Sequence, residues 1–217
     1  MLANMRQTAE LVDVFRRHGN KHTYKKGDYI IHPGETPSGV FYIYEGLVKA
    51  YDITRYGEEN LLIIRKSHEI FPLIWALTGE ERSVIYQTLA PTIAWKISRE
   101  CFEKEIMAHP AAMAPILDMT IEMYRLHSER ILNLEYRSVR ERIVSFLLTM
   151  AARFGEQTDE GLKIAVPLRH QDIASSVNAS RETASRELAT LERRGLIVNH
   201  QSSIVLVDQK QLEAVLL

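Results

Sequence analysis

The hydrophobic pattern divides the chain into three zones, and the first zone is typical of β-structure. Short runs rich in Ile, Val, Tyr and Thr alternate with glycine-containing turns. We expect strands at 21–24, 29–31, 39–44, 47–53, 60–64, 83–89 and 92–97. In the last run Ile93, Trp95 and Ile97 alternate with Thr92, Ala94 and Lys96, which predicts a half-buried strand. Many short strands without intervening helices indicate a barrel or jelly roll.

Helical periodicity dominates the second zone. We expect a short helix ending at Ala108 and a long helix over 111–134, with Pro110 suited to its first position. Its apolar residues follow a heptad spacing at Ala112, Ile116, Met119, Met123 and Leu126. Such a seam fits a helix lying on its own domain or one that pairs with a second copy. Beside a self-contained barrel, we favour a homodimer through helix 111–134.

The third zone begins with a clear helix start and ends in a mixed pattern. The segment Ser138-Val-Arg-Glu141 is a capping box, and its helix should run to about Phe154. We expect a polar loop at Glu156–Gly161. The region 162–207 then predicts strand, helix, turn, helix, strand and strand.

Two short helices separated by a turn stand out within Leu168–Ile197. The first, at about Arg169–Val177, places Ile173, Ala174 and Val177 inward, and Asn178-Ala179 forms the turn. The hydroxyl of Ser180 suits the N-cap of the second helix. One face of that helix is apolar, with Ala184, Leu188 and Leu191. The opposite face carries Glu182, Arg186, Ala189 and Arg193, with Arg181 on the flank.

This order of elements is typical of a helix that reads DNA. Arginine can donate two hydrogen bonds to guanine, and glutamate can accept one from cytosine in the major groove. Gly195 ends the helix, and Leu196–Val198 with Ile204–Val207, joined by Asn199–Ser203, would form a two-stranded wing. The alternative is a plain helical hairpin with a solvated charged face.

Composition narrows the class of protein. The 217 residues carry a net charge of −1, with 46% hydrophobic and 25% charged residues, as in ordinary soluble proteins. The longest nearly apolar run, 144–152, is too short to span a membrane. Residues 1–15 contain Arg6, Glu10 and Asp13 and do not resemble a signal peptide, so we expect a cytoplasmic protein.

Charge placement refines the DNA hypothesis. From Ser138 onward there are ten Lys or Arg and ten Asp or Glu residues, so even this part is neutral. Five arginines nevertheless fall between 169 and 194. This balance excludes strong non-specific coating of DNA and predicts an affinity that depends on geometry and base contacts.

The sequence offers little support for an enzyme or a metal site. It contains no GxSxG, Walker or GxGxxG motif, and its eight histidines show no HxH or HExxH spacing. The single cysteine, Cys101, excludes a disulfide framework and an all-cysteine iron–sulfur cluster within one chain. We therefore expect no enzymatic activity, no metal and no resident cofactor.

The chain resembles the Crp/Fnr family of bacterial transcription regulators, which are of the cyclic AMP receptor protein type. The segment Ser180–Arg186 resembles the recognition-helix motif of that family, and 26–28, 33–35 and 44–49 resemble its barrel. The resemblance implies an α+β fold with a cyclic-nucleotide-binding-type β-roll (jelly roll) over 1–109. A dimerisation helix and hinge would follow at 110–137, and a winged helix-turn-helix at 138–217.

The resemblance also implies site residues and partners. Arg181, Glu182 and Arg186 match the base-reading set, which suggests a TGTGA-like half-site and its inverted copy in double-stranded DNA. Phosphate contact or helix positioning is implied for Ser180, Thr183 and His170. The hinge falls at 133–138 and includes Asn133, Leu134 and Ser138. RNA polymerase is the further partner that the resemblance implies.

The segment that binds cyclic AMP in related proteins departs from the family pattern here. Arg82 and Ser83 match that pattern, but Phe71 and Pro72 replace the Gly-Glu pair that approaches the nucleotide. Proline removes the carboxylate and a backbone donor. We therefore expect an effector other than cyclic AMP in a more apolar pocket. The candidate pocket residues are Phe71, Trp75, Arg82, Ser83, Tyr86, His127 and Ser128. For Phe71, Trp75, Tyr86 and His127, an ordinary role in the barrel core or an interface is an explanation at least as good.

Three alternatives stay open. One is a regulator that still depends on a cyclic nucleotide, since Ser128 matches one member of the purine-contacting pair and His127 does not. Another is a ligand-binding module without DNA-binding activity. A haem sensor would need an axial ligand from His68, Cys101 or His127, and we disfavour it because isolated histidines usually have structural or solvated roles.

Overall fold

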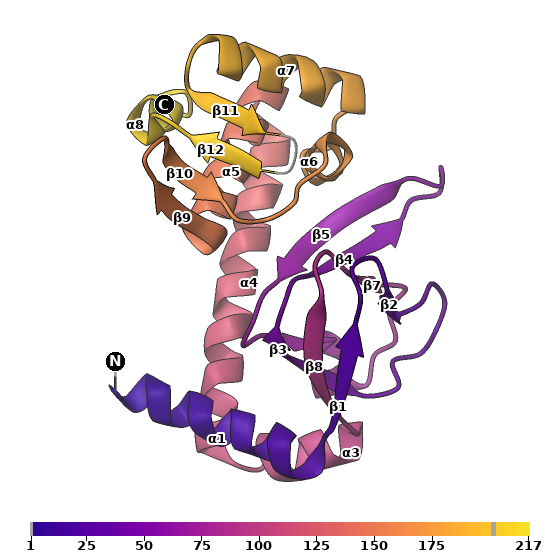
Figure 1. The fold of residues 1–217 in the computed structure, drawn as a ribbon. Helices are drawn as coiled ribbons and strands as arrows, with labels where there is room; N and C mark the ends of the chain where they lie inside the picture. Colours follow the sequence, from indigo (N-terminus) through magenta and orange to yellow (C-terminus); the bar gives the residue numbers. More distant parts are fainter. Residues whose placement is uncertain (1, 201–202) are drawn as a thin grey trace. The chain divides into compact units, whose positions relative to one another are not determined.

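The computed structural model describes residues 2–200 and 203–217. The chain forms two compact units (Figure 1). The first unit comprises residues up to Asp52 together with Leu62–Arg125, and the second comprises Ile53–Leu61 together with Leu126–Leu217. Strand β5 (Glu59–Arg65) and helix α4 (Pro110–Tyr136) each contribute residues to both units. The second unit therefore includes the tip of a hairpin that precedes it by more than sixty residues.

Two four-stranded antiparallel sheets form the first unit, with strand orders β1-β8-β3-β6 and β2-β7-β4-β5. The predicted jelly-roll-type β-domain of an α+β fold is confirmed. Besides β5, the strands are β1 (Asn20–Tyr24), β2 (Tyr29–Ile31), β3 (Val40–Glu45), β4 (Val48–Ile53), β6 (Ile70–Phe71), β7 (Ile85–Thr88) and β8 (Thr92–Ile97). The helical elements are α1 (Leu2–His18), α2 (Leu73–Thr78), α3 (Arg99–Phe102) and a π-helical turn, η1 (Glu103–Met107).

Two hydrophobic clusters hold the first unit together. One joins α1 to α3, η1 and α4, where the side chains of Phe15, Phe102 and Ile116 are fully buried. The other lies among the strands and contains Phe41, Phe71 and Tyr86. Helices α1 and α2 have no counterpart among the predicted elements. Among the described side chains of α1, Leu11, Val14 and Phe15 are buried and stand among polar residues.

Strand β8 is covered on both faces, so the prediction of a half-buried strand is wrong. In β8 the side chains of Thr92 and Ala94 are 1% and 0% exposed, whereas Ile93 and Trp95 are only partly buried. Both faces of this strand are covered, so the larger residues do not mark the more buried face. The Thr92 hydroxyl donates to the backbone oxygen of Ala90 at 2.9 Å, which makes its burial tolerable.

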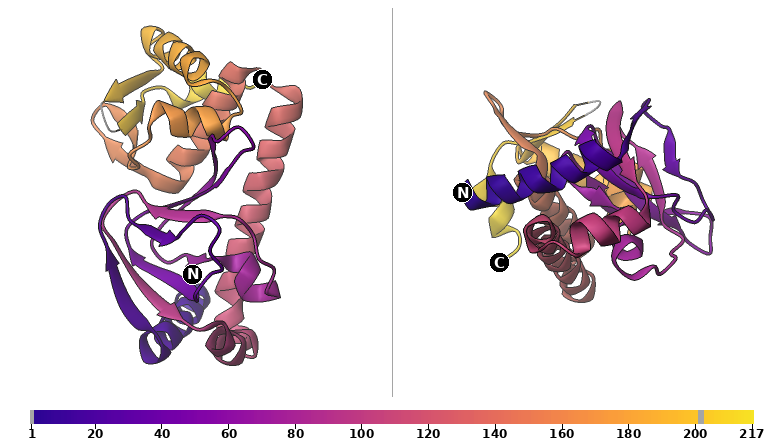
Figure 2. Two further views of the ribbon diagram at one scale, coloured as in Figure 1. Left: turned by 90° about the vertical axis from the view of Figure 1, so that its right-hand side faces the viewer. Right: turned by 90° about the horizontal axis from the view of Figure 1, so that it is seen from below.

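The heptad seam of helix α4 differs from the prediction, because its first residues pack inside the first unit. Ala112, Ile116 and Met119 are 3%, 0% and 9% exposed because they pack into the first unit's own core. Helix α4 is a single helix without a break (Figure 2). A different face of this helix carries exposed apolar side chains. These side chains are Leu117, Ile121, Tyr124 and Ile131, between 58% and 75% exposed. The predicted seam therefore faces the protein's own core up to Met123, while its last residue, Leu126, belongs to the second unit.

The second unit is a winged helix-turn-helix with a four-stranded sheet of order β11-β12-β10-β9. Its elements after α4 are α5 (Val139–Phe154), β9 (Gly155–Thr158), β10 (Gly161–Ile164), α6 (His170–Ser176), α7 (Arg181–Arg193), β11 (Ile197–His200), β12 (Ser203–Leu206) and α8 (Gln209–Ala214). The predicted order of elements over 162–207 is confirmed. The predicted polar loop at Glu156–Gly161 is wrong, since β9 pairs with β10 and only 159–160 remain as a turn.

The junction between α4 and α5 is short. Helix α4 continues through Asn133 and Leu134 to Tyr136, so the helical break of the predicted hinge is confined to Arg137 and Ser138. The amide of Asn133 donates to the Ser145 hydroxyl on α5 at 2.8 Å. Ser138 and Glu141 form the predicted capping box, and the Ser138 N–H donates to the Glu141 carboxylate at 2.7 Å.

Candidate nucleic-acid interface

Helices α6 and α7 form the helix-turn-helix, and a tight turn separates them. The inward-facing residues of the first helix, Ile173, Ala174 and Val177, are buried as predicted, at 0%, 0% and 3% exposure. Asn178 adopts the left-handed conformation with φ of 50°, which asparagine tolerates better than most residues. The fully buried Ala174 allows the two helices to pack closely.

Ser180 is the N-cap of α7, as the sequence predicts. Its hydroxyl oxygen accepts a hydrogen bond from the Thr183 backbone N–H at 3.1 Å. The neighbouring Glu182 side chain is exposed, and hydrogen bonds from its own backbone N–H and from the Ser180 hydroxyl lower its pKa. Glu182 is thus ionised at neutral pH and suited to accept a hydrogen bond.

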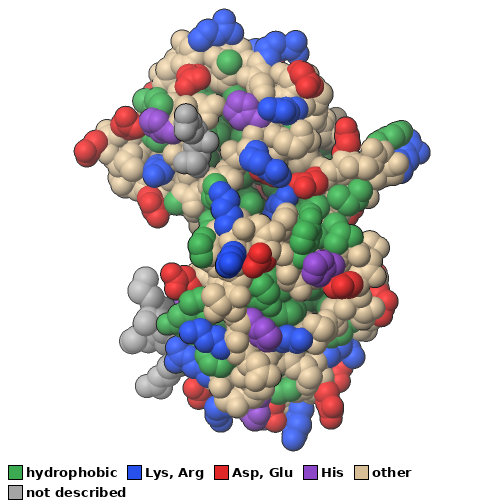
Figure 3. Space-filling model, turned by 45° about the vertical axis from the view of Figure 1, so that its right-hand side comes forward, with side chains coloured by type: hydrophobic (Ala, Val, Ile, Leu, Met, Phe, Trp, Pro, Cys, Tyr) green, Lys and Arg blue, Asp and Glu red, His purple; other side chains and the backbone are tan. Residues whose placement is uncertain are grey.

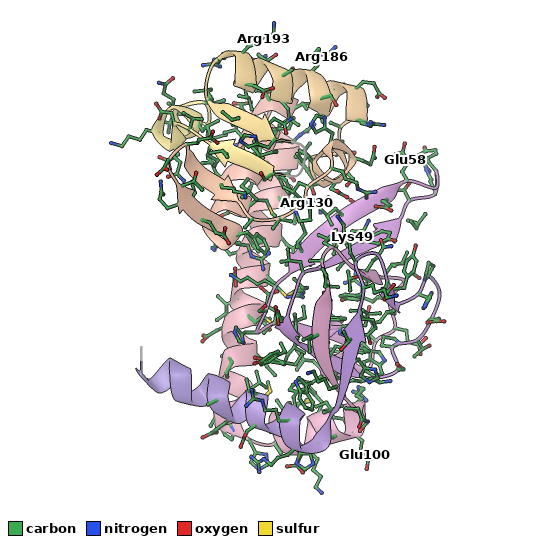
Figure 4. The ribbon with its side chains drawn as sticks, viewed as in Figure 1. Lys49, Glu58, Glu100, Arg130, Arg186 and Arg193 are labelled. Atoms are coloured by element: carbon green, nitrogen blue, oxygen red, sulfur yellow. The ribbon has the colours of Figure 1, made fainter. Side chains whose placement is uncertain are left out.

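Helix α7 is amphipathic in the predicted sense. Ala184, Leu188 and Leu191 are buried at 0%, 1% and 0% exposure, while Arg181, Glu182 and Arg186 are exposed. Figure 4 shows Arg186 and Arg193 projecting on the outer side of α7, away from the sheet. Acidic and basic side chains are mixed on the face seen in Figure 3, which is consistent with a neutral net charge.

Side chains from neighbouring elements fix the position of α7. His170, at the start of α6, contacts the Ser185 hydroxyl through Nδ1 at 2.8 Å and the Asn199 side-chain amide through Nε2 at 3.0 Å. With both ring nitrogens engaged, His170 fits the helix-positioning role rather than phosphate contact. An ion pair of 2.7 Å joins Arg140 on α5 to Glu187 on α7.

Sequence reasoning missed the partners that hold α7. Ser185 and Glu187 lie on α7 itself, Asn199 on β11 and Arg140 on α5, and no local pattern links these three elements. The signal available in the sequence is that Ser185 and Glu187 are polar residues next to the apolar stripe of α7.

The wing follows α7 as predicted. Gly195 has φ of 69°, a left-handed conformation that favours glycine and ends the helix. Strands β11 and β12 pair through Ile197↔Leu206 and His200↔Ser203. Both strands extend into the predicted loop, and each is one residue shorter than predicted at its other end. Residues 201 and 202 of the predicted loop lie outside the described residues.

The candidate effector residues of the first unit fall into separate environments. Phe71 is fully buried between Phe41 and Tyr86, with ring centroids 5.2 and 4.6 Å away. Trp75 lies on α2 and packs against the other hydrophobic cluster. Arg82 and Ser83 are exposed in the segment before β7. Three stacked aromatic rings therefore occupy the interior at the position of Phe71.

A buried charge lies in the same unit that sequence reasoning did not single out. Arg65 is 2% exposed, pairs with buried Glu69 at 3.4 Å and donates to the Met123 sulfur at 2.9 Å. Burial raises the pKa of the Tyr86 hydroxyl, and the nearby positive charge of Arg65 opposes that shift. The signal available in the sequence is a charged residue directly after the apolar run Leu61–Ile64.

The remaining candidate effector and haem-ligand residues have separate surroundings. His127 and Ser128 lie half-buried on α4, within the second unit. His68 is hydrogen-bonded through Nδ1 to the Tyr42 hydroxyl at 2.6 Å, and Cys101 is partly buried, which raises its pKa. Across 2–200 and 203–217 no group of three His, Cys, Asp or Glu side chains is arranged to hold a metal ion. None of the helices described there has the length and hydropathy to cross a membrane.

Comparison with known proteins covers both units. A cyclic nucleotide-binding domain model matches residues 21–109, and a Crp-like helix-turn-helix domain model matches residues 141–215. The chain is 28% identical over 209 residues to a global nitrogen regulator from Synechocystis sp., covering 89% of this chain and 90% of the relative. It is also 28% identical over 207 residues to the cAMP-activated global transcriptional regulator CRP of Salmonella typhimurium, covering 94% and 98%.

A solved structure shares the fold. The CooA mutant from Carboxydothermus hydrogenoformans matches with a TM-score of 0.78 and 21% identity, over 94% of this chain and 90% of that one.

Proposed function

Because the chain belongs to the Crp/Fnr family of DNA-binding transcription regulators, we propose that it binds an inverted repeat of TGTGA-like half-sites as a homodimer. The observation that carries this proposal is the exposed set Arg181, Glu182 and Arg186 in the first half of α7, with Glu182 and Arg186 opposite its buried face and Arg181 on the flank. Each arginine can pair with guanine, and ionised Glu182 can accept from cytosine. Two such helices would enter successive major grooves about 34 Å apart.

The exposed apolar face of α4 supports the homodimer. Leu117, Ile121, Tyr124 and Ile131 recur at spacings of four, three and seven residues, so they share one face of the helix. A second copy of α4 would cover this face and bring two reading helices into one molecule. RNA polymerase is the further partner that this reading of the family implies.

We propose that the protein responds to an effector other than cyclic AMP. Phe71 and Tyr86 stack where the related proteins bring backbone and carboxylate to the nucleotide, and Pro72 supplies neither a carboxylate nor an N–H. Cyclic AMP is the second candidate, because Arg82 and Ser83 match the family pattern and the Salmonella relative is cAMP-activated. No haem, iron–sulfur cluster or enzymatic step is part of the proposal.

A gel-shift experiment with a labelled inverted repeat tests the function. We expect a specific band that a scrambled duplex of equal length does not compete away, and a weaker complex with a single half-site. If repeat and scrambled duplexes compete equally, the regulator proposal is wrong. Calorimetry with cyclic AMP then tests the effector: the proposal predicts no saturable heat, and micromolar binding would favour the second candidate.

A further inference from the structure

The tip of the β4–β5 hairpin contacts α6 near both of its ends. Within the second unit, the Glu59 carboxylate accepts a hydrogen bond from Arg169, the residue directly before α6, at 3.1 Å. Two residues along the strand, the Leu61 N–H donates to the Ser175 hydroxyl at 3.4 Å, one residue before the helix ends. The strand residues thus run beside a helix of seven residues and hold both its start and its end.

Arg130 on α4 binds the hairpin and α6 with one guanidinium group. Its Nη1 donates to the Leu61 carbonyl at 2.8 Å, and its Nη2 donates to the Asn60 side-chain oxygen at 3.0 Å. A third, longer bond of 3.4 Å runs from Nη2 to the Ser175 carbonyl. Arg130 is half-buried, so these charge-assisted bonds are less screened than those of a fully exposed side chain.

The group that Glu59 binds is already fixed in place. Asp172 is 3% exposed and accepts from Arg169 Nε at 3.0 Å and Nη2 at 2.8 Å. The Asp172 carboxylate also accepts the Arg169 backbone N–H at 2.9 Å. These hydrogen bonds raise the pKa of the Arg169 guanidinium above its usual range. Glu59 therefore contacts a guanidinium whose conformational freedom is already lost, which lowers the entropic cost of the ion pair.

Helix α6 transmits its position to α7. His170 begins α6 and is hydrogen-bonded to Ser185 in the middle of α7. A rotation of α6 would break that bond or carry α7 with it. The exposed side chains proposed to read bases lie on α7. The hydrogen bonds that fix α6 therefore also affect how these side chains are oriented.

We propose that Glu59 and Arg130 are positioning residues for DNA reading, which hold α6, and through it α7, in the orientation that reads a half-site. This inference rests on the proposed function of α7. It assigns a role in DNA reading to Glu59, a residue of the β4–β5 hairpin that lies far from the helix-turn-helix in the sequence.

The test compares full-length Glu59→Gln and Arg130→Gln with wild type. Glu58→Gln is the matched control, because it removes an equal charge from the neighbouring, exposed residue of the same hairpin. Hydrogen exchange of the α6 and α7 amides is followed by mass spectrometry, and affinity for repeat and scrambled duplexes by fluorescence anisotropy. Arg130→Lys, which keeps one donor for the Leu61 carbonyl, serves as the conservative variant.

We expect faster exchange in α6 for both variants and unchanged exchange for the control. Operator affinity should fall about two- to fivefold for Glu59→Gln and roughly tenfold or more for Arg130→Gln. Arg130→Lys should recover part of that loss, and affinity for scrambled DNA should stay unchanged in every variant. If Arg130→Gln does not fold, Glu59→Gln still decides, since it breaks a partly exposed ion pair only.

Other outcomes overturn the inference. Unchanged α6 exchange in Glu59→Gln would show that the hairpin does not hold the helix. Faster α6 exchange with unchanged operator affinity would show that the contacts of Glu59 and Arg130 with α6 do not contribute to DNA recognition. If wild type itself does not prefer the repeat, the proposed function fails, and the exchange data alone then decide whether the hairpin holds α6.

Discussion

Replacing Ile121 by alanine should weaken the proposed dimer without unfolding the protomer. Ile121 lies on the exposed apolar face of α4 and is 58% exposed in the single chain. In a symmetric dimer the same residue is lost on both copies, so its effect counts twice.

The magnitude follows from the exposed area. Burying an isoleucine side chain completely is worth about 1.5–3 kcal/mol. Somewhat more than half of Ile121 remains to be buried, and alanine retains its Cβ, which leaves about 1 kcal/mol for each copy. The dimer should lose about 2 kcal/mol, which is roughly a 30-fold rise in its dissociation constant.

Sedimentation velocity over a range of concentrations measures this constant. Ile53→Ala is the matched control, because Ile53 is 48% exposed but lies on β4 and not on the α4 face. Ile116→Ala, on the buried face, should lower the free energy of unfolding and leave the dissociation constant of the folded protein unchanged. An Ile121→Ala dimer as tight as wild type would refute the assignment of this face.

Three further substitutions test local features. Ser180→Ala should lower the free energy of unfolding by about 1 kcal/mol in urea denaturation, because it removes the N-cap of α7. Phe71→Ala should lower it by about 3–5 kcal/mol in the same assay, because it removes a fully buried ring stacked on Tyr86. Hydrogen bonds from Ser138 lower the pKa of Glu141, so its stabilising effect is present at neutral pH and lost as pH falls through that lowered pKa. The melting temperatures of wild type and Glu141→Ala should therefore differ at neutral pH and converge in acid, and a constant difference would contradict this role.

Local signals predicted the DNA-binding half of the chain well. The cap at Ser180, the apolar stripe at Ala184 and Leu188, and the end of the helix at Gly195 each depend on neighbouring residues only. The order of elements from β10 to β12 follows from signals of the same kind, whereas β9 was not predicted.

Periodicity could not show what covers an apolar face. The heptad on α4 is real, but Ile116 and Met119 pack into the protein's own core, while the exposed face carries the less regular set that includes Ile121. The same limit applies to β8, where both faces are covered and Ala94 is more buried than Trp95.

Long-range polar contacts lay beyond sequence reasoning altogether. The partners of Arg130 and Arg169 in the hairpin tip are separated from them by 69 and 110 residues. Nothing in either local segment indicates the other.

Pairing a protein variant with a base substitution tests the central claim, that exposed side chains of α7 read DNA, most directly. The affinities of wild type and Arg181→Ala are measured for the repeat and for repeats in which one base pair is changed symmetrically in both half-sites. The account predicts that Arg181→Ala loses about 1–3 kcal/mol on the original repeat and becomes indifferent to the identity of one G·C pair. An Arg181→Ala protein that binds every duplex more weakly by the same factor, with full base preference retained, would contradict it.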